Sequence, residues 1–160
     1  MTADEYVLKI DAVTQLVTVI AGGGTDATPD TGDVPTDLNL ITPAQLAVDS
    51  DGNIYFHDDD LHSLILINGS VSLVLGAAST TLVNGPPDIH ANIIDLEVDA
   101  SGNLFATLSA SLILPLQIVQ INTSTGAYAS VAGGGGVTDP TIPNPIATDS
   151  DLSNITDFTF

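Results

Sequence analysis

The sequence predicts an all-β protein built from four-stranded antiparallel sheets. Short alternating strands, separated by turns rich in Asp, Asn and Gly, recur along the chain. Residues that favour helices are scarce apart from Ala and Leu, since the chain of 160 residues has one Lys, no Arg and only two Glu among its 20 acidic residues. Asp, which makes up the rest of the acidic residues, favours turns and caps.

A repeated hairpin gives the clearest element. Residues 47–56, AVDSDGNIYF, recur fifty residues later at 97–106 as EVDASGNLFA. Each copy consists of a strand with alternating side chains, a turn and a second strand. A glycine in the turn supplies the positive φ that a tight turn needs. The predicted structural turn residues are Asp49, Gly52, Asn53, Asp99, Gly102 and Asn103.

Two further elements complete a repeating unit. An outer hairpin occurs at 7–24 and at 118–135, and a copy three residues shorter at its turn begins at Leu64. A segment that precedes each inner hairpin begins at Leu38, Ile89 and Leu152. We therefore expect one domain over 1–160. Its parts are the outer strands of a first unit (1–24), a second unit (36–78), a third unit (88–135) and the first strand of the next unit (150–160).

Four-stranded units with a period of about 40–60 residues are typical of the blades of a β-propeller, although such repeats also form open arrays. The predicted fold is thus about two complete blades with parts of two others. The connections at 22–37, 79–88 and 133–149 are rich in Gly, Pro, Thr and Asp and are expected to be loops.

The repeat resembles the bacterial type of NHL repeat, in which a Val-Ala-Gly strand end, a variable loop and a Val-Asp-x-x-Gly-Asn-aromatic hairpin follow one another. The match falls on Val48 and Val98, on the turn residues named above, and on Tyr55 and Phe105. The resemblance implies a propeller, which closes with about six blades in that family. The basic residues that usually follow the hairpin are replaced by segments such as LHSLILI at 61–67, so no basic binding face is expected.

Fewer than three blades leave strand edges open. Because an unpaired edge invites another strand, the chain is predicted to be a segment of a longer protein or a protomer that completes its sheet by association. The predicted partners are other protein chains, including copies of itself. A formal charge of −19 disfavours nucleic acid and anionic membranes, and no apolar run approaches the length of a transmembrane helix.

One short run could bind a metal ion. His57, Asp58, Asp59 and Asp60, with His62 nearby, offer imidazole and oxygen ligands, but the spacings of EF-hand and zinc sites are absent. The competing interpretation is a solvated turn between two strands. A lone histidine, His90, is interpreted as structural.

Other motifs have ordinary interpretations. The glycine runs at 22–24 and 133–136 lack the helix and Lys of a phosphate-binding loop. Sequons for glycosylation occur at Asn68, Asn122 and Asn154, and the first two fall in equivalent turns.

The predicted function is a non-catalytic structural or protein-interaction module of a secreted or cell-surface protein, such as a self-assembling adhesin or an extracellular filament subunit. No enzymatic activity and no cofactor are expected. One alternative is a fragment of a six-bladed lyase or lactonase with a channel metal, for which the predicted first strands offer Gln45, Asp95, Glu97 and Asp157. Another is an adhesion module whose Asp-rich loops, 26–37 and 139–151, bind calcium.

Overall fold

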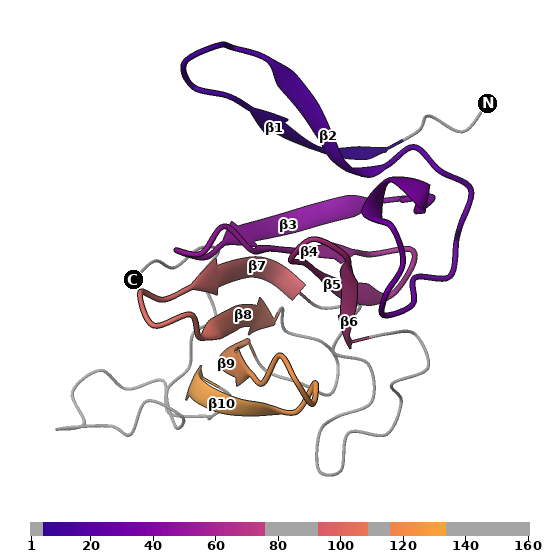
Figure 1. Ribbon diagram of the computed structural model, residues 1–160. Coiled ribbons are helices and arrows are strands. Elements are labelled where there is room, and N and C mark those ends of the chain that lie inside the picture. The colour runs from indigo at the N-terminus through magenta and orange to yellow at the C-terminus, as the bar shows by residue number, and fades with distance from the viewer. Residues whose placement is uncertain (1–4, 76–92, 109–115, 134–160) are drawn as a thin grey trace, which may run out of the picture.

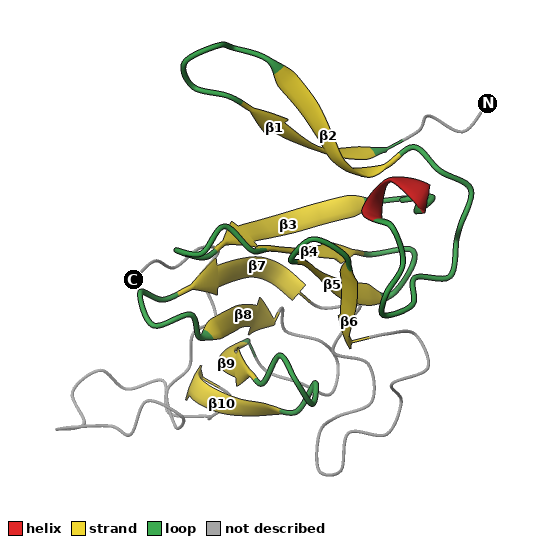
Figure 2. Ribbon diagram, in the orientation of Figure 1, coloured by secondary structure: helices red, strands yellow, loops and turns green. Residues whose placement is uncertain are grey.

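The computed structural model describes residues 5–75, 93–108 and 116–133. These residues are almost entirely strands and turns, with one short 3-10 turn, η1, at Pro35–Asp37 (Figure 2). The strands are β1 (Tyr6–Ile10), β2 (Val17–Gly22), β3 (Pro43–Val48), β4 (Ile54–Asp58), β5 (Ser63–Ile67), β6 (Val71–Leu75), β7 (Ile93–Val98), β8 (Leu104–Leu108), β9 (Gln117–Ile121) and β10 (Tyr128–Gly133).

The strands form three separate antiparallel sheets. β1 and β2 make a two-stranded hairpin, while β3-β4-β5-β6 and β7-β8-β9-β10 are four-stranded sheets in which neighbours in sequence are neighbours in space. The predicted all-β fold with four-stranded antiparallel sheets is confirmed. β1 and β2 lie within the predicted first unit, 1–24, whereas the strand expected at 150–160 lies outside the described residues.

Strand pairing repeats from sheet to sheet, irregularities included. Each outer hairpin has a register shift at one residue of its second strand, namely Ile20, Val74 and Val131. Each inner hairpin has a shift near the start of its first strand. A β-bulge bends a strand and increases its twist, so its recurrence makes the three outer hairpins geometrically equivalent. β1, β5 and β9 are then corresponding strands.

The sheets stack face to face in chain order, with the first hairpin above β3 and the third sheet below it (Figure 1). The innermost strands, β3 and β7, lie side by side. Alternation along the strands sends one set of apolar side chains to each face. Two clusters result, and both include residues of the central sheet.

One cluster joins the central and third sheets, and the other joins the first hairpin to the central sheet. The first contains Ala47, Tyr55, Leu64, Val74, Ile93, Leu96, Leu104, Ala106, Leu108, Val119 and Ile121. The second contains Val7, Ala21, Leu38, Leu40, Phe56, Leu61, Ile65, Ile67 and Val71.

The connection over 22–37 is the predicted loop, apart from η1. At its start, Gly24 donates a hydrogen bond to the carbonyl of Leu38, and a Cβ at Gly24 would collide with the backbone of Asp37. A glycine is required there because two backbone segments touch. Farther along, Gly32 donates to the carbonyl of Val71, and Val71 donates to that of Asp33. The loop therefore covers the outer edge of β6.

Candidate functional site

The outer face of the first hairpin is the most distinctive surface among the described residues. It consists of Leu8, Ile10, Val17 and Val19, all exposed, and we call it the outer hairpin face. The opposite side of the hairpin packs on the central sheet through residues such as Val7 and Ala21. Monomeric proteins rarely leave a contiguous apolar surface of this kind uncovered.

The corresponding residues of the central sheet show that this exposure is exceptional. Leu8 is 53% exposed, whereas Ile65 at the equivalent position of β5 is 0% exposed. Ile10 is exposed in the same way, and its counterpart Ile67 is buried. The difference arises because the first hairpin covers the central sheet and no described element covers the hairpin.

The two predicted hairpin turns have the same network of hydrogen bonds. Asp49 Oδ1 accepts from the backbone N–H groups of Asp51 (3.0 Å) and Asn53 (2.9 Å), and its Oδ2 accepts from the side-chain amide of Asn53 (2.8 Å). Asp99 makes the equivalent contacts at 2.9, 2.8 and 2.7 Å. Gly52 and Gly102 have φ of 84° and 81°. These residues serve the turn itself.

The same hydrogen bonds control the ionisation of the two carboxyl groups. At Asp99 the side chain and then the backbone N–H of Asn103 lower the pKa below its usual value. At Asp49 burial acts to raise the pKa, but hydrogen bonds from Asn53 and neighbouring N–H groups outweigh it, so the pKa is again lowered. Both carboxylates are held ionised, as acceptors for turn donors.

The run from His57 to Asp60 is not the solvated turn that was one interpretation of the sequence. His57 and Asp58 are the last two residues of β4 and are fully buried, and only Asp59 and Asp60 lie in the exposed turn. Asp58 accepts hydrogen bonds from the backbone N–H groups of Ile41 (2.9 Å), Thr42 (3.2 Å) and Leu61 (3.1 Å). Its carboxylate thus ties the approach to β3 to the turn after β4.

The buried imidazole of His57 lies against the turn that follows β4. Its Nδ1 is 2.8 Å from Oδ1 of Asp59, and among the residues that the structure describes its Nε2 has no hydrogen-bond partner. Burial lowers the pKa of His57, although the carboxylates of Asp59 and Asp58 act against this effect. The imidazole is therefore neutral over a wider pH range than a solvated one.

Within 5–75, 93–108 and 116–133, no three His, Cys, Asp or Glu side chains form a group that could hold a metal ion. His62 is exposed beside the run from His57 to Asp60, with φ of 49°.

In the loop expected to bind calcium, Asp26 accepts hydrogen bonds from the backbone N–H and the hydroxyl of Thr28, each at 3.0 Å. Gln45, Asp95 and Glu97 lie on β3 and β7 as predicted first-strand residues. The remaining candidates, His90, Asp157 and 139–151, lie outside the described residues.

The first two sequons fall in turns of the outer hairpins. Asn68 and Asn122 are exposed, between β5 and β6 and between β9 and β10 respectively. Asn122 Oδ1 accepts hydrogen bonds from the N–H groups of Ser124 (3.1 Å) and Thr125 (3.0 Å), so the side chain is part of the turn. Asn154 lies outside the described residues.

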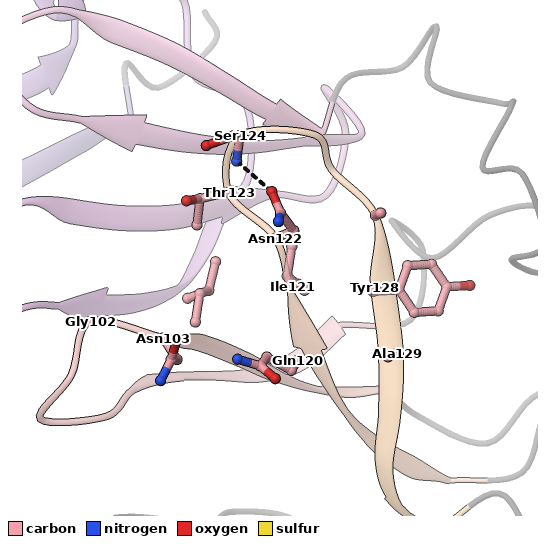
Figure 3. A pocket seen from close by; sticks show the side chains of 11 residues that line it. Gly102, Asn103, Gln120, Ile121, Asn122, Thr123, Ser124, Tyr128 and Ala129 are labelled. Atoms are coloured by element: carbon pink, nitrogen blue, oxygen red, sulfur yellow. Dashed lines mark hydrogen bonds between the residues drawn. The ribbon is translucent and has the colours of Figure 1, made fainter.

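A shallow pocket of about 450 Å³ lies beside this turn on the third sheet. Its labelled polar side chains include Asn103, Gln120, Asn122 and Thr123, and the ring of Tyr128 extends away from them (Figure 3). Burial raises the pKa of Tyr128. The pocket wall is neutral and polar, with no charged group or nucleophile matched to a base.

No model of a known protein family matches the sequence, and no curated protein matches it. Among the described residues, no helix has the length and apolar character needed to cross a membrane.

Sequence reasoning identified the turns but missed the outer hairpin face as a specific set of residues. The signal was available, because Leu8, Ile10, Val17 and Val19 alternate with the residues that face the central sheet. Apolar residues on both faces of a strand, rather than on one, indicate that both faces are covered. They do not reveal which face lacks a neighbour.

Proposed function

We propose that this chain is a non-catalytic structural and protein-interaction module, which binds other protein chains through its outer hairpin face. The observation that supports it is the exposure of Leu8 and Ile10 at positions where the central sheet buries Ile65 and Ile67. Burying about 100 Å² of apolar surface contributes about 2.5 kcal/mol, so covering several such side chains favours association strongly.

The proposal includes a propeller-like arrangement of the NHL type. Successive stacking of antiparallel sheets, with the first strands β3 and β7 side by side, supports it. The chain would act in a secreted or cell-surface protein, as the acidic composition and the exposed sequons at Asn68 and Asn122 suggest.

Copies of the same chain are the first partner to consider. With a formal charge of −19, two copies repel each other at low ionic strength. Salt screens this repulsion, with a Debye length of about 10 Å at 0.1 M. Association through apolar side chains should therefore strengthen as salt is added, whereas association through ion pairs would weaken.

Light scattering combined with small-angle X-ray scattering tests the proposal over a range of protein and salt concentrations. We expect discrete oligomers or fibres that the double variant Leu8→Asp, Ile10→Asp dissociates. The matched control is Val13→Asp, because Val13 is 91% exposed in the turn of the same hairpin. A chain that stays monomeric under all these conditions, or oligomers that the double variant leaves intact, would contradict the proposal.

A further inference from the structure

The outer edge of β6 in the central sheet is covered by part of the connection between the first hairpin and that sheet. Gly32 donates a hydrogen bond to the carbonyl of Val71, and Val71 donates one to the carbonyl of Asp33. The backbone N–H of Leu73 donates to the hydroxyl of Thr31 (3.1 Å). The backbone groups that point out of this edge therefore have partners within the molecule.

The equivalent edge of the first hairpin, along β2, is open among the described residues. β2 has the same register with β1 as β6 has with β5, so Val17 and Val19 stand at the positions of Val71 and Leu73. Their backbone N–H and C=O groups consequently point out of the sheet. β2 also contacts η1, but Val17 is 59% exposed and Val19 is 41% exposed. Among the described strands, β2 pairs with β1 alone.

No charged residue and no proline protects this edge against strand pairing. Natural sheets commonly blunt an exposed edge with such residues, and residues 16–21, LVTVIA, contain neither. This run has instead the high β-propensity, without charge, proline or glycine, that is typical of segments that pair between chains. The bulge at Ile20 interrupts the regular edge, so the residues left to pair are those from Val17 to Val19.

We infer that β2 pairs antiparallel with β2 of a second copy of this chain, about a two-fold axis at Thr18. Val17 of each copy exchanges backbone hydrogen bonds with Val19 of the other, and the two Thr18 residues face each other as a non-hydrogen-bonded pair. The inference rests on the proposed function, and it names the partner and the strand that meets it. The two hairpins then form one four-stranded antiparallel sheet, like the central and third sheets.

The edge is complementary to itself, which favours a second copy over an unrelated strand. Val17 and Val19 flank Thr18 symmetrically, so pairing about Thr18 gives each outward backbone group of these two residues a partner. The pairing also sets β-branched side chains beside one another. Residues 12–25 contain no charged side chain, so no like charges oppose each other across the pair, although the chain has a formal charge of −19.

The pairing also enlarges the apolar surface. Backbone hydrogen bonds alone contribute little to association in water, because each replaces a bond to water. Side chains that oppose each other in a sheet lie on the same face, so pairing Val17 with Val19 places the outer hairpin faces of both copies on one side of the joint sheet. The two faces together present a larger apolar surface for association than either hairpin does alone.

Disulfide cross-linking tests the pairing in the full chain, which has no cysteine of its own. In the inferred pair the Cα atoms of the two Thr18 residues lie about 4.5 Å apart, within the range of about 4.4–6.8 Å that a disulfide spans. We expect Thr18→Cys to form linked dimers in a glutathione redox buffer at least about tenfold faster than Val13→Cys. Val13→Cys is the matched control, because Val13 is 91% exposed in the turn of the same hairpin.

Two substitutions at one position separate strand pairing from side-chain burial. Val17→Pro removes an outward N–H at the first residue of β2, a position where a strand tolerates proline. Added to Thr18→Cys, it should reduce the cross-linking rate to that of Val13→Cys. Val17→Thr keeps both the N–H and the branched Cβ, and it should leave the rate within about twofold.

Amide hydrogen exchange measures the same pairing without a substitution. The N–H groups of Val17 and Val19 point away from β1, so in dilute protein they should exchange rapidly. Their exchange should slow as the protein concentration rises into the range where light scattering detects association.

The outcomes separate this inference from the proposed function. Equal cross-linking of Thr18→Cys and Val13→Cys would overturn the inference, and so would rapid exchange at Val17 and Val19 in protein that is associated. If the oligomers still depend on Leu8 and Ile10, the proposed function stands without the strand pairing. Rapid cross-linking at Thr18, in oligomers that Leu8→Asp, Ile10→Asp leaves intact, supports the pairing and contradicts the proposed function.

Discussion

The central and third sheets have the same strand order and the same irregularities, but the residues at the end of their second strands differ in chemistry. In β4 the strand ends on buried His57 and Asp58, and in β8 the equivalent residues are Thr107 and Leu108, which are also buried. The repeat therefore preserves burial at these positions while the chemistry changes from charged and polar to mostly apolar.

The same two sheets differ in what covers them. The third sheet packs against a complete four-stranded neighbour, and the central sheet has on its other side a hairpin of two strands. Residues that share a position in the repeat consequently have different exposures. The comparison shows that the sequence of a unit determines its register, while the neighbouring unit determines how much each apolar residue contributes to stability.

The largest expected effect tests this difference in covering. Leu96→Ala should lower the free energy of unfolding by about 3 kcal/mol, because it leaves a cavity in the cluster between the two sheets. Leu46→Ala should cost less than about 1 kcal/mol, because solvent already reaches its side chain. Urea unfolding of both variants gives the comparison. Equal losses would mean that β3 is covered as well as β7.

The next effect concerns the two strand ends. Asp58→Asn should cost about 2 kcal/mol, because an amide keeps one acceptor oxygen and turns an N–H₂ group towards backbone donors. Leu108→Asn provides a contrasting variant, since it buries an amide where an apolar cluster is packed. Chemical denaturation measures both. If Asp58→Asn were neutral, the carboxylate would not be what holds Ile41 and Leu61.

More of the fold than of the functional surface could be predicted from the sequence. Alternation and the Asp-x-x-Gly-Asn turn are local, so they can be recognised within ten residues and compared between copies. Burial of Asp58 could not be predicted, because its donors at Ile41 and Thr42 lie 17 and 16 residues away in sequence. The exposure of Leu46 depends on a neighbouring sheet, and nothing in its own strand distinguishes it from Leu96.

A smaller effect should be the same in both sheets. Gly52 and Gly102 have positive φ, and a Cβ at either position would meet no other atom within 4 Å. Replacement by Ala should therefore cost about 1 kcal/mol, from backbone strain alone. Asn should cost less because it tolerates the left-handed region. Thermal unfolding of the two pairs of variants tests whether the turns are equivalent, and unequal losses would show that they are not.

The smallest effect is the pH dependence that His57 gives to the central sheet. Because burial lowers the pKa of His57, the folded protein binds its proton less readily than the unfolded chain does. The free energy of unfolding is therefore highest above the ordinary histidine pKa of about 6.5. It decreases as the pH falls from there towards the lower pKa of His57 in the folded state.

His57→Gln should therefore flatten the decline in stability between about pH 6.5 and pH 5, a window above most carboxyl titrations. Urea unfolding at a series of pH values measures the slope. An unchanged slope in His57→Gln would mean that the imidazole binds its proton equally well in the folded and the unfolded protein. A steeper decline would mean that the buried ring is protonated in the folded protein, stabilised by Asp59 rather than neutralised by burial. The strand ends of the central and third sheets would then differ in charge as well as in polarity.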